Sequence, residues 1–176
     1  TTAPRLPRRA LAAGVPAADA DDARRLEFFN GIGGFAAQGR EYRISAPEGQ
    51  NTPVPWINVV ANEHFGFLVS ADGTGYTWHQ NSRENQLTAW SNDPVTDRNP
   101  EVIYLRDDDT GDVWCPTPGP VPRTAESGRY VVEHSAGVSR FTHASHGVEQ
   151  ELTVFVDAED PLKFSLLTLT NRSSHP

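Results

Sequence analysis

Sulfur-containing residues are almost absent from this sequence, which has one cysteine and no methionine among 176 residues. Cys115 therefore has no partner within the chain for a disulfide, and the fold has to rest on a hydrophobic core. This excludes a small secreted scaffold held by cross-links. A single thiol also fits a reducing compartment.

Basic residues are also scarce, because 15 Lys and Arg stand against 23 Asp and Glu, for a formal net charge of −8. The one basic cluster is Arg5, Arg8 and Arg9. Since a nucleic-acid-binding surface needs a dense basic face to neutralise phosphates, nucleic acid is excluded as a partner. No stretch approaches the roughly 18–20 consecutive apolar residues of a membrane-spanning helix, so no membrane span is expected.

The ends of the sequence differ from its middle. Residues 1–27 are Ala-rich and interrupted by Gly14 and Pro16, so we predict a linker that is disordered or weakly helical, with its only helix candidate at residues 20–29. The sequence has no initiating Met, and its last apolar run stops five residues before the terminus. We therefore expect residues 28–176 to be a partial domain cut from a longer polypeptide.

From residue 41 onward the pattern is typical of an all-β, antiparallel β-sandwich. Short apolar or alternating runs are separated by clusters of Gly, Pro, Asn and Asp. In residues 148–156, Val148, Gln150, Leu152, Val154 and Val156 share one face, and Glu149, Glu151 and Thr153 share a wet one. Strands are predicted at 41–46, 56–61, 65–70, 75–79, 101–106, 112–115, 129–135, 138–143, 147–157 and 162–171.

The run from Leu162 to Leu169 has apolar residues on both faces, which indicates a central strand that is covered on both sides. Residues 71–75 and 107–112 carry the Asp and Gly of hairpin loops. Residues 115–122 contain four prolines, so this segment is expected to run extended over the surface.

Three short motifs resemble ligand sites but lack the context. Gly31–Ala36 matches the dinucleotide pattern G-x-G-x-x-G/A, but no strand precedes it and no helix follows, which favours a glycine-rich turn. Asp107–Asp112 begins like a calcium loop, yet Pro118 stands where the loop's final Glu is required. His143 and His146 lie on opposite faces of a strand unless a turn intervenes. No cofactor or metal is therefore expected.

The segment from Tyr76 to Pro94 combines two Trp with many amide and hydroxyl side chains. This mixture suits a sugar, because the C–H face of a pyranose packs on an aromatic ring while amides and carboxylates bind its hydroxyls. A long loop whose amides satisfy its own backbone fits the composition equally well. We expect this loop to present at least one of Trp78 and Trp90 with a partly exposed ring, flanked by Arg83.

A glycosidase would need a pair of carboxylates at a defined separation. Asp93 with Asp97, or Glu84 with Asp93, are the pairs that the sequence offers. The sequence does not set their spacing, and carboxylates in turns are usually solvated. We therefore assign no catalytic residue.

Taken together, six ordered motifs resemble the amino-terminal region of glycoside hydrolase family 94, which is also described as glycosyltransferase family 36-like. The pattern is most similar to cyclic β-1,2-glucan synthases (the NdvB-type proteins) and more distantly to cellobiose and chitobiose phosphorylases. It covers about residues 28–172. The motifs lie within residues 30–42, 52–59, 65–70, 76–85, 87–94 and 104–118.

This resemblance implies the first part of a large β-sandwich that is joined to an (α/α)6-barrel. The general acid and the phosphate-binding residues would lie on that barrel, and inorganic phosphate would bind only there. The sandwich would be non-catalytic and would shape the sugar-acceptor side of the cleft for a β-glucan or β-linked oligosaccharide. On the same resemblance, the substrate-side residues are Trp78, Arg83, Asn85, Trp90 and Asn92.

Two other functions remain open. One is a free-standing lectin-like carbohydrate-binding module, and the other is a complete small glycosidase. The substrate-side residues would equally well brace their loop against the barrel. The parent would sit at the inner membrane, with this region on its cytoplasmic side.

Overall fold

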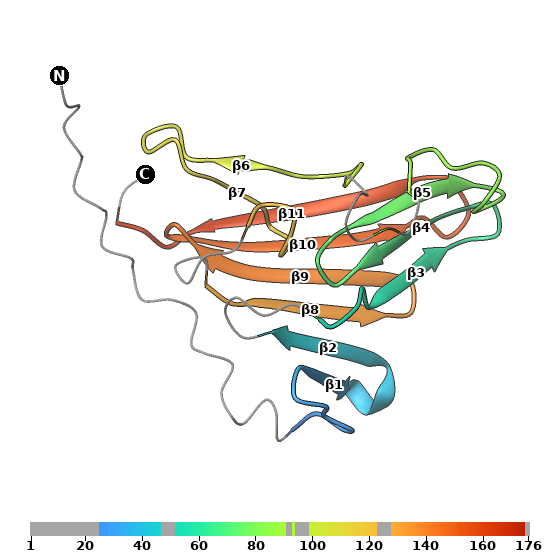
Figure 1. The fold of residues 1–176 in the computed structure, drawn as a ribbon, viewed down its shortest axis with the longest axis horizontal. Coiled ribbons are helices and arrows are strands. Elements are labelled where there is room, and N and C mark those ends of the chain that lie inside the picture. The colour runs from blue at the N-terminus through green and yellow to red at the C-terminus, as the bar shows by residue number, and fades with distance from the viewer. Residues whose placement is uncertain (1–24, 47–51, 91–92, 94–98, 123–127, 175–176) are drawn as a thin grey trace.

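The computed structural model describes residues 25–46, 52–90, 93, 99–122 and 128–174. Within them the chain is almost entirely strand and loop, with one short 3-10 turn, η1 (Figure 1). No helix of this described part is long and apolar enough to cross a membrane. The elements are β1 (Gly33–Ala36), η1 (Ala37–Gly39), β2 (Glu41–Ala46), β3 (Ile57–Ala61), β4 (Phe65–Ser70), β5 (Gly75–His79), β6 (Leu105–Arg106), β7 (Val113–Trp114), β8 (Tyr130–Ser135), β9 (Val138–Ser145), β10 (Val148–Val156) and β11 (Lys163–Asn171).

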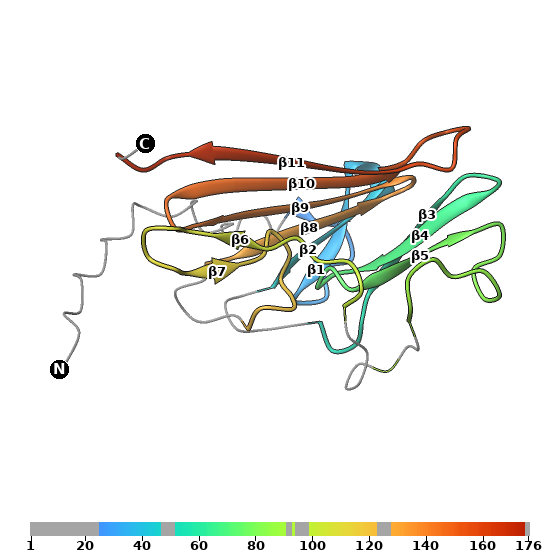
Figure 2. The same cartoon turned by 90° about the horizontal axis from the view of Figure 1, so that it is seen from above.

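The strands form two layers, as in a β-sandwich. A large sheet has the order β1-β2-β8-β9-β10-β11, and a small sheet has the order β3-β4-β5. Strands β6 and β7 form a separate two-stranded hairpin. Every pairing is antiparallel. Figure 2 shows the large sheet on one side, with the small sheet and the β6-β7 hairpin on the other.

The hydrophobic core lies between the two sheets. Phe67, which is fully buried, packs from the small sheet against Phe141 and Leu152 of the large sheet. Asn58 of β3 reaches across and donates its side-chain amide to the carbonyls of Ser135 and Val138, at 2.9 and 3.1 Å. The other buried core residues are Ile44, Val60, Val69, Ala71, Val132 and Val154.

The predicted alternation of β10 is confirmed. Gln150, Leu152 and Val154 are buried, and Glu151 is exposed on the other face. The observed strands agree with most of the predicted ranges, because alternation in an antiparallel sheet is set by which face is buried. The hairpin turns at 71–75 and 107–112 are also found, with Gly73 and Gly111 at positive φ.

The prediction of a turn throughout Gly31–Ala36 was wrong, because only its start turns. Gly31 has a φ of +99°, whereas Gly33–Ala36 form β1 and pair with β2. The glycines are needed for packing, since a Cβ on Gly34 would lie 2.8 Å from the Cβ of Leu26. The helix predicted at 20–29 does not reach residue 29, because Glu27 pairs as an extended residue with Phe35; residues 20–24 lie outside the described residues.

Strand β11 is not the covered central strand that its sequence predicted. It is an edge strand of the large sheet as described, paired only with β10. Phe164, Leu166 and Leu169 are 41%, 61% and 50% exposed, and they lie on both faces of the strand. The apolar pattern indicates that both faces of the strand favour burial, but it does not identify the segment that would cover them.

The proline-rich segment is extended, but it does not lie wholly on the surface. Cys115 and Pro116 at its start are buried, and the carbonyl of Cys115 accepts a hydrogen bond from the Tyr130 hydroxyl at 2.9 Å. The β6-β7 hairpin and the segment after it therefore close one end of the core. Strands β6 and β7 are shorter than predicted, with two residues each.

Candidate functional site

The outer face of the small sheet carries a row of three aromatic rings. Tyr76 and Trp78 alternate with Thr77 on β5 and so share one face. The Tyr76 ring stacks on Trp90, with centroids 4.9 Å apart and planes 18° apart, and lies 5.3 Å from the Trp78 ring. Trp78 and Trp90 are both partly exposed, as the sequence predicted for at least one of them.

Trp78 owes its position to the glycine opposite it. The register of β4 and β5 pairs Gly66 with Trp78. A Cβ on Gly66 would lie 2.6 Å from a Trp78 ring carbon, so the ring lies directly over the glycine. The indole therefore packs against the outer face of the sheet at Gly66.

The loop after β5 is tightly folded and presents a polar tip. The Asn81 carboxamide oxygen accepts hydrogen bonds from the backbone N–H groups of Arg83 and Glu84, both at 2.9 Å. Trp78 pairs with Gln86, which closes the loop at its base. Arg83 is 90% exposed and forms a 3.2 Å ion pair with Glu84.

The predicted substrate-side residues therefore fall into two groups. Trp78 and Trp90 are joined through Tyr76 on the sheet face, while Arg83 and Asn85 lie at the exposed loop tip. Asn92 lies outside the described residues. Trp78 lies on β5, whereas Arg83, Asn85 and Trp90 lie in the loop that follows it, and the side chains at the loop tip are exposed.

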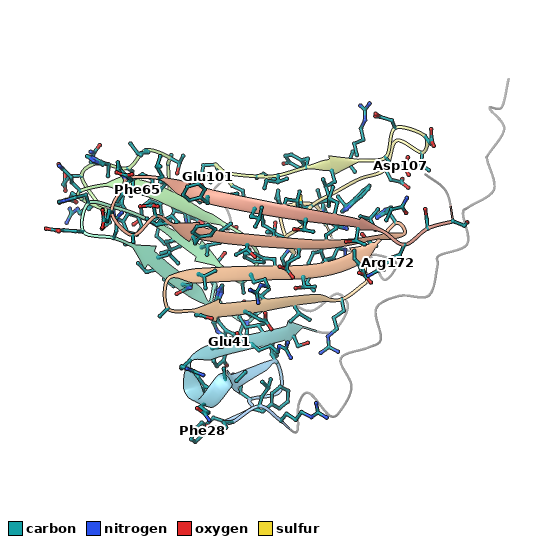
Figure 3. All side chains as sticks on the ribbon, turned by 180° about the vertical axis from the view of Figure 1, so that it is seen from behind. Phe28, Glu41, Phe65, Glu101, Asp107 and Arg172 are labelled. Atoms are coloured by element: carbon teal, nitrogen blue, oxygen red, sulfur yellow. The ribbon has the colours of Figure 1, made fainter. Side chains whose placement is uncertain are left out.

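A partly buried carboxylate, that of Glu101, fixes the far end of this loop. Glu101 accepts hydrogen bonds from the hydroxyls of Thr77 and Thr88, at 2.5 and 2.7 Å, and pairs with the Lys163 ammonium group. Burial raises the pKa of the Glu101 carboxyl, but the Lys163 charge and these hydrogen bonds outweigh it, so that the pKa lies below its ordinary value of 4.5. Figure 3 shows Glu101 beside the end of the molecule that contains Phe65.

A pocket of about 200 Å³ opens beside Trp90 on the same outer face. Ser70, Asp72 and Thr74 from the β4-β5 turn form one side of it, and Asp93 and Asn99 lie near the end of the long loop. Its apolar lining is Pro55, Ile57, Leu68, Trp90 and Pro120.

Hydrogen bonds hold the polar side of this pocket. Asp72 Oδ1 accepts bonds from the Ser70 hydroxyl and from the backbone N–H of Thr74, the latter at 3.1 Å. The Thr74 hydroxyl donates to Asn99 Oδ1 at 2.6 Å. Sequence reasoning missed Asp72, Asn99 and Pro120, because they come from separate segments; the turn at 71–75 was the only local signal.

The structure places only part of the carboxylate and histidine pairs that the sequence offered. Glu84 pairs with Arg83, Asp93 lines the pocket, and Asp97 lies outside the described residues. His143 stacks on Tyr130 at 3.6 Å, whereas His146 stacks on Trp114 at 4.1 Å. Among residues whose placement is described, no three His, Cys, Asp or Glu side chains are grouped to hold a metal.

These features define an antiparallel β-sandwich domain with an aromatic row and a small half-polar pocket on its outer face. Residues 40–176 match the family model "Glycosyl hydrolase 94, supersandwich domain". The chain therefore belongs to the glycosyl hydrolase 94 supersandwich family, as its motifs predicted.

Among its relatives, the chain is 44% identical over 153 residues to the cyclic beta-(1,2)-glucan synthase NdvB of Rhizobium meliloti (strain 1021), which covers 87% of this chain and 5% of the relative. It is 31% identical over 144 residues to the N,N'-diacetylchitobiose phosphorylase of Vibrio furnissii, an alignment that covers 82% of this chain and 18% of the relative. It is 32% identical over 153 residues to the solabiose phosphorylase of Paenibacillus borealis, an alignment that covers 81% of this chain and 18% of the relative. The chain thus spans less than a fifth of the length of each of these relatives.

Proposed function

We propose that this chain is the non-catalytic, carbohydrate-associated sandwich of a β-glucan phosphorylase or cyclic β-1,2-glucan synthase. In this proposal it shapes the sugar-acceptor side of a cleft whose catalytic (α/α)6-barrel is another part of the polypeptide. The relatives that are named as a glucan synthase and as phosphorylases support the substrate class. The observation that carries the proposal is the row of Trp78, Tyr76 and Trp90 beside a loop tip of exposed amides and Arg83.

The reaction of such an enzyme needs groups that these residues do not supply. In inverting phosphorolysis, phosphate attacks the anomeric carbon while a carboxylic acid protonates the leaving oxygen. We assign the acid and the phosphate site to the barrel. Trp78 and Trp90 would pack on sugar C–H faces, while Arg83 and Asn85 would donate hydrogen bonds to hydroxyls and orient the sugar.

The exposed apolar side chains of β11 favour the view that a further layer of protein covers them. The stacked rings of Phe155 and Phe164, 5.1 Å apart, continue into the exposed Leu166 on the same face of the large sheet. Natural edge strands are normally protected by charges, prolines or a covering element. Residues 164–170 carry neither a charged residue nor a proline. This disfavours the free-standing lectin-like module.

Phosphorolysis assays on two forms of the protein test this proposal. The full-length protein and the 176-residue chain would each be incubated with sophorose or longer β-1,2-glucans and phosphate, after circular dichroism has confirmed β-structure in the chain. We expect glucose 1-phosphate from the full-length protein only. Turnover by the chain alone that Asp93→Asn abolishes would instead establish a small glycosidase or phosphorylase.

A further inference from the structure

The pocket beside Trp90 has the size of a site for one small ring. Its volume of about 200 Å³ is below the roughly 300 Å³ at which pockets for drug-sized ligands begin. We propose that this pocket binds a single neutral hexopyranose unit through contacts made by this chain alone. The proposal takes its ligand class from the proposed function and adds a defined site to it.

The apolar wall of the pocket offers a flat surface to a sugar ring. One face of the Trp90 indole is occupied by the Tyr76 ring, and the indole also lines the pocket. Ile57 and Pro120 complete this wall. Because Tyr76 is itself buried, it holds the Trp90 ring in place before any ligand arrives. A preorganised aromatic surface of this kind packs against the C–H face of a pyranose.

The opposite wall supplies both an acceptor and a donor for hydroxyl groups. Both hydrogen bonds that the described residues make to the Asp72 carboxylate end on Oδ1, so Oδ2 can accept a bond from a ligand. The Thr74 hydroxyl donates a hydrogen bond to Asn99 Oδ1, and the Asn99 Nδ2 group can donate one to a ligand. A sugar hydroxyl donates and accepts at once, and it matches this pair of groups.

The charge of the pocket selects a neutral ligand. Asp72 and Asp93 both line it, and the described lining residues include no Lys, Arg or His. A sugar phosphate would therefore be repelled by the Asp72 carboxylate, with no cation among the described lining residues to offset the repulsion. A hydrated cation would find partners in those carboxylates, but half of its surroundings would be the apolar wall of Ile57, Trp90 and Pro120.

Two tryptophan substitutions on β3 provide a matched test. Ile57 and Val59 are two residues apart on β3, so their side chains lie on the same face of the strand, and they are 48% and 55% exposed. Only Ile57 lines the pocket. Ile57→Trp fills the pocket, whereas Val59→Trp adds the same indole beside it. Calorimetric titration of the full-length protein with methyl β-glucoside would count sites, and crystals soaked in the same glucoside would locate them.

We expect the wild type and Val59→Trp to bind one more glucoside per chain than Ile57→Trp. In Ile57→Trp the affinity of the pocket for the glucoside should fall about tenfold or more. Density for the sugar should lie against Trp90, and glucose 6-phosphate should not compete. Equal titrations of the two variants, an empty pocket in soaked wild-type crystals, or Ca²⁺ in place of the sugar would each overturn the proposal.

Failure of this pocket is distinguishable from failure of the proposed function. If Ile57→Trp leaves glucoside binding unchanged while Arg83→Ala still impairs glucan turnover, only the pocket assignment is wrong. If the pocket binds the glucoside while variants of the Arg83 loop turn over glucan normally, the assignment of the loop is wrong instead.

Discussion

Lys163, the first residue of β11, forms an ion pair with Glu101 at the end of the long loop that follows β5. The two residues are 62 positions apart in sequence, and their side chains are 21% and 29% exposed. The Lys163 ammonium group also lies 4.4 Å from the centroid of the Phe67 ring in the core. The ion pair therefore links the loop that carries Trp90 to the edge of the large sheet and to the core.

Replacing Glu101 should loosen this link. Glu101→Gln removes a partly buried charge that three donors share, and we expect a loss of about 1–3 kcal/mol in the free energy of unfolding at pH 7. Because the folded pKa lies below 4.5, the stabilisation is complete above that pH and is lost as the pH falls through the folded pKa. Urea titrations from pH 3 to pH 7 check this. A wild type and a Gln variant with the same pH dependence would contradict it.

His134 should give a second pH dependence in a less acidic range. Burial lowers its pKa to about 4, against a weaker opposing effect of a hydrogen bond with the Trp56 backbone. The unfolded chain takes up this proton at pH 6.5 and the folded chain does not, so stability is full above pH 6.5 and falls as the pH drops toward 4. The full loss is about 3 kcal/mol at 1.36 kcal/mol per pKa unit.

His134→Gln should remove most of this slope between pH 6.5 and pH 4. His64→Gln is a suitable control, because the His64 side chain is 58% exposed. Urea midpoints measured at half-unit pH intervals would show the difference. The account of His134 fails if both variants keep the slope of the wild type.

Trp78 and Trp90 should respond differently to truncation. Trp78 covers Gly66, so Trp78→Ala opens the sheet surface and should cost about 2 kcal/mol of stability, less than the ~3–5 kcal/mol of a fully buried Trp. Trp90→Ala should weaken sugar binding by about 1–3 kcal/mol with a smaller loss of stability. Thermal unfolding and glucan titration of the full-length protein separate the two effects. If both variants lose stability while their folded fraction binds normally, the aromatic row is only structural.

The sequence predicted the fold best where alternation had one buried face, as in β10 with Leu152 and Val154 inward and Glu151 outward. It failed at β1, where the glycines that usually mark a turn leave room for Leu26 and Tyr42. It also failed at β11, because apolar residues such as Leu166 and Leu169 indicate that both faces of the strand are covered but do not identify the segment that covers them. Composition alone indicated the partly exposed Trp side chains. The pocket was not predictable, since Ile57, Asp72 and Asn99 meet only through the packing of separate segments.

The role of the loop tip is tested most directly by the kinetics of Arg83→Ala in the full-length protein, with Arg106→Ala as its matched control. Both arginines are exposed and pair with a nearby carboxylate, but Arg106 belongs to the β6-β7 hairpin. With sophorose or a longer β-1,2-glucan and phosphate, we expect Arg83→Ala to raise KM for the sugar about tenfold, which corresponds to ~1.4 kcal/mol. Its melting temperature should stay at the wild-type value, and Arg106→Ala should change neither quantity. An unchanged KM, or a lowered melting temperature without a change in KM, would contradict a sugar-contacting loop.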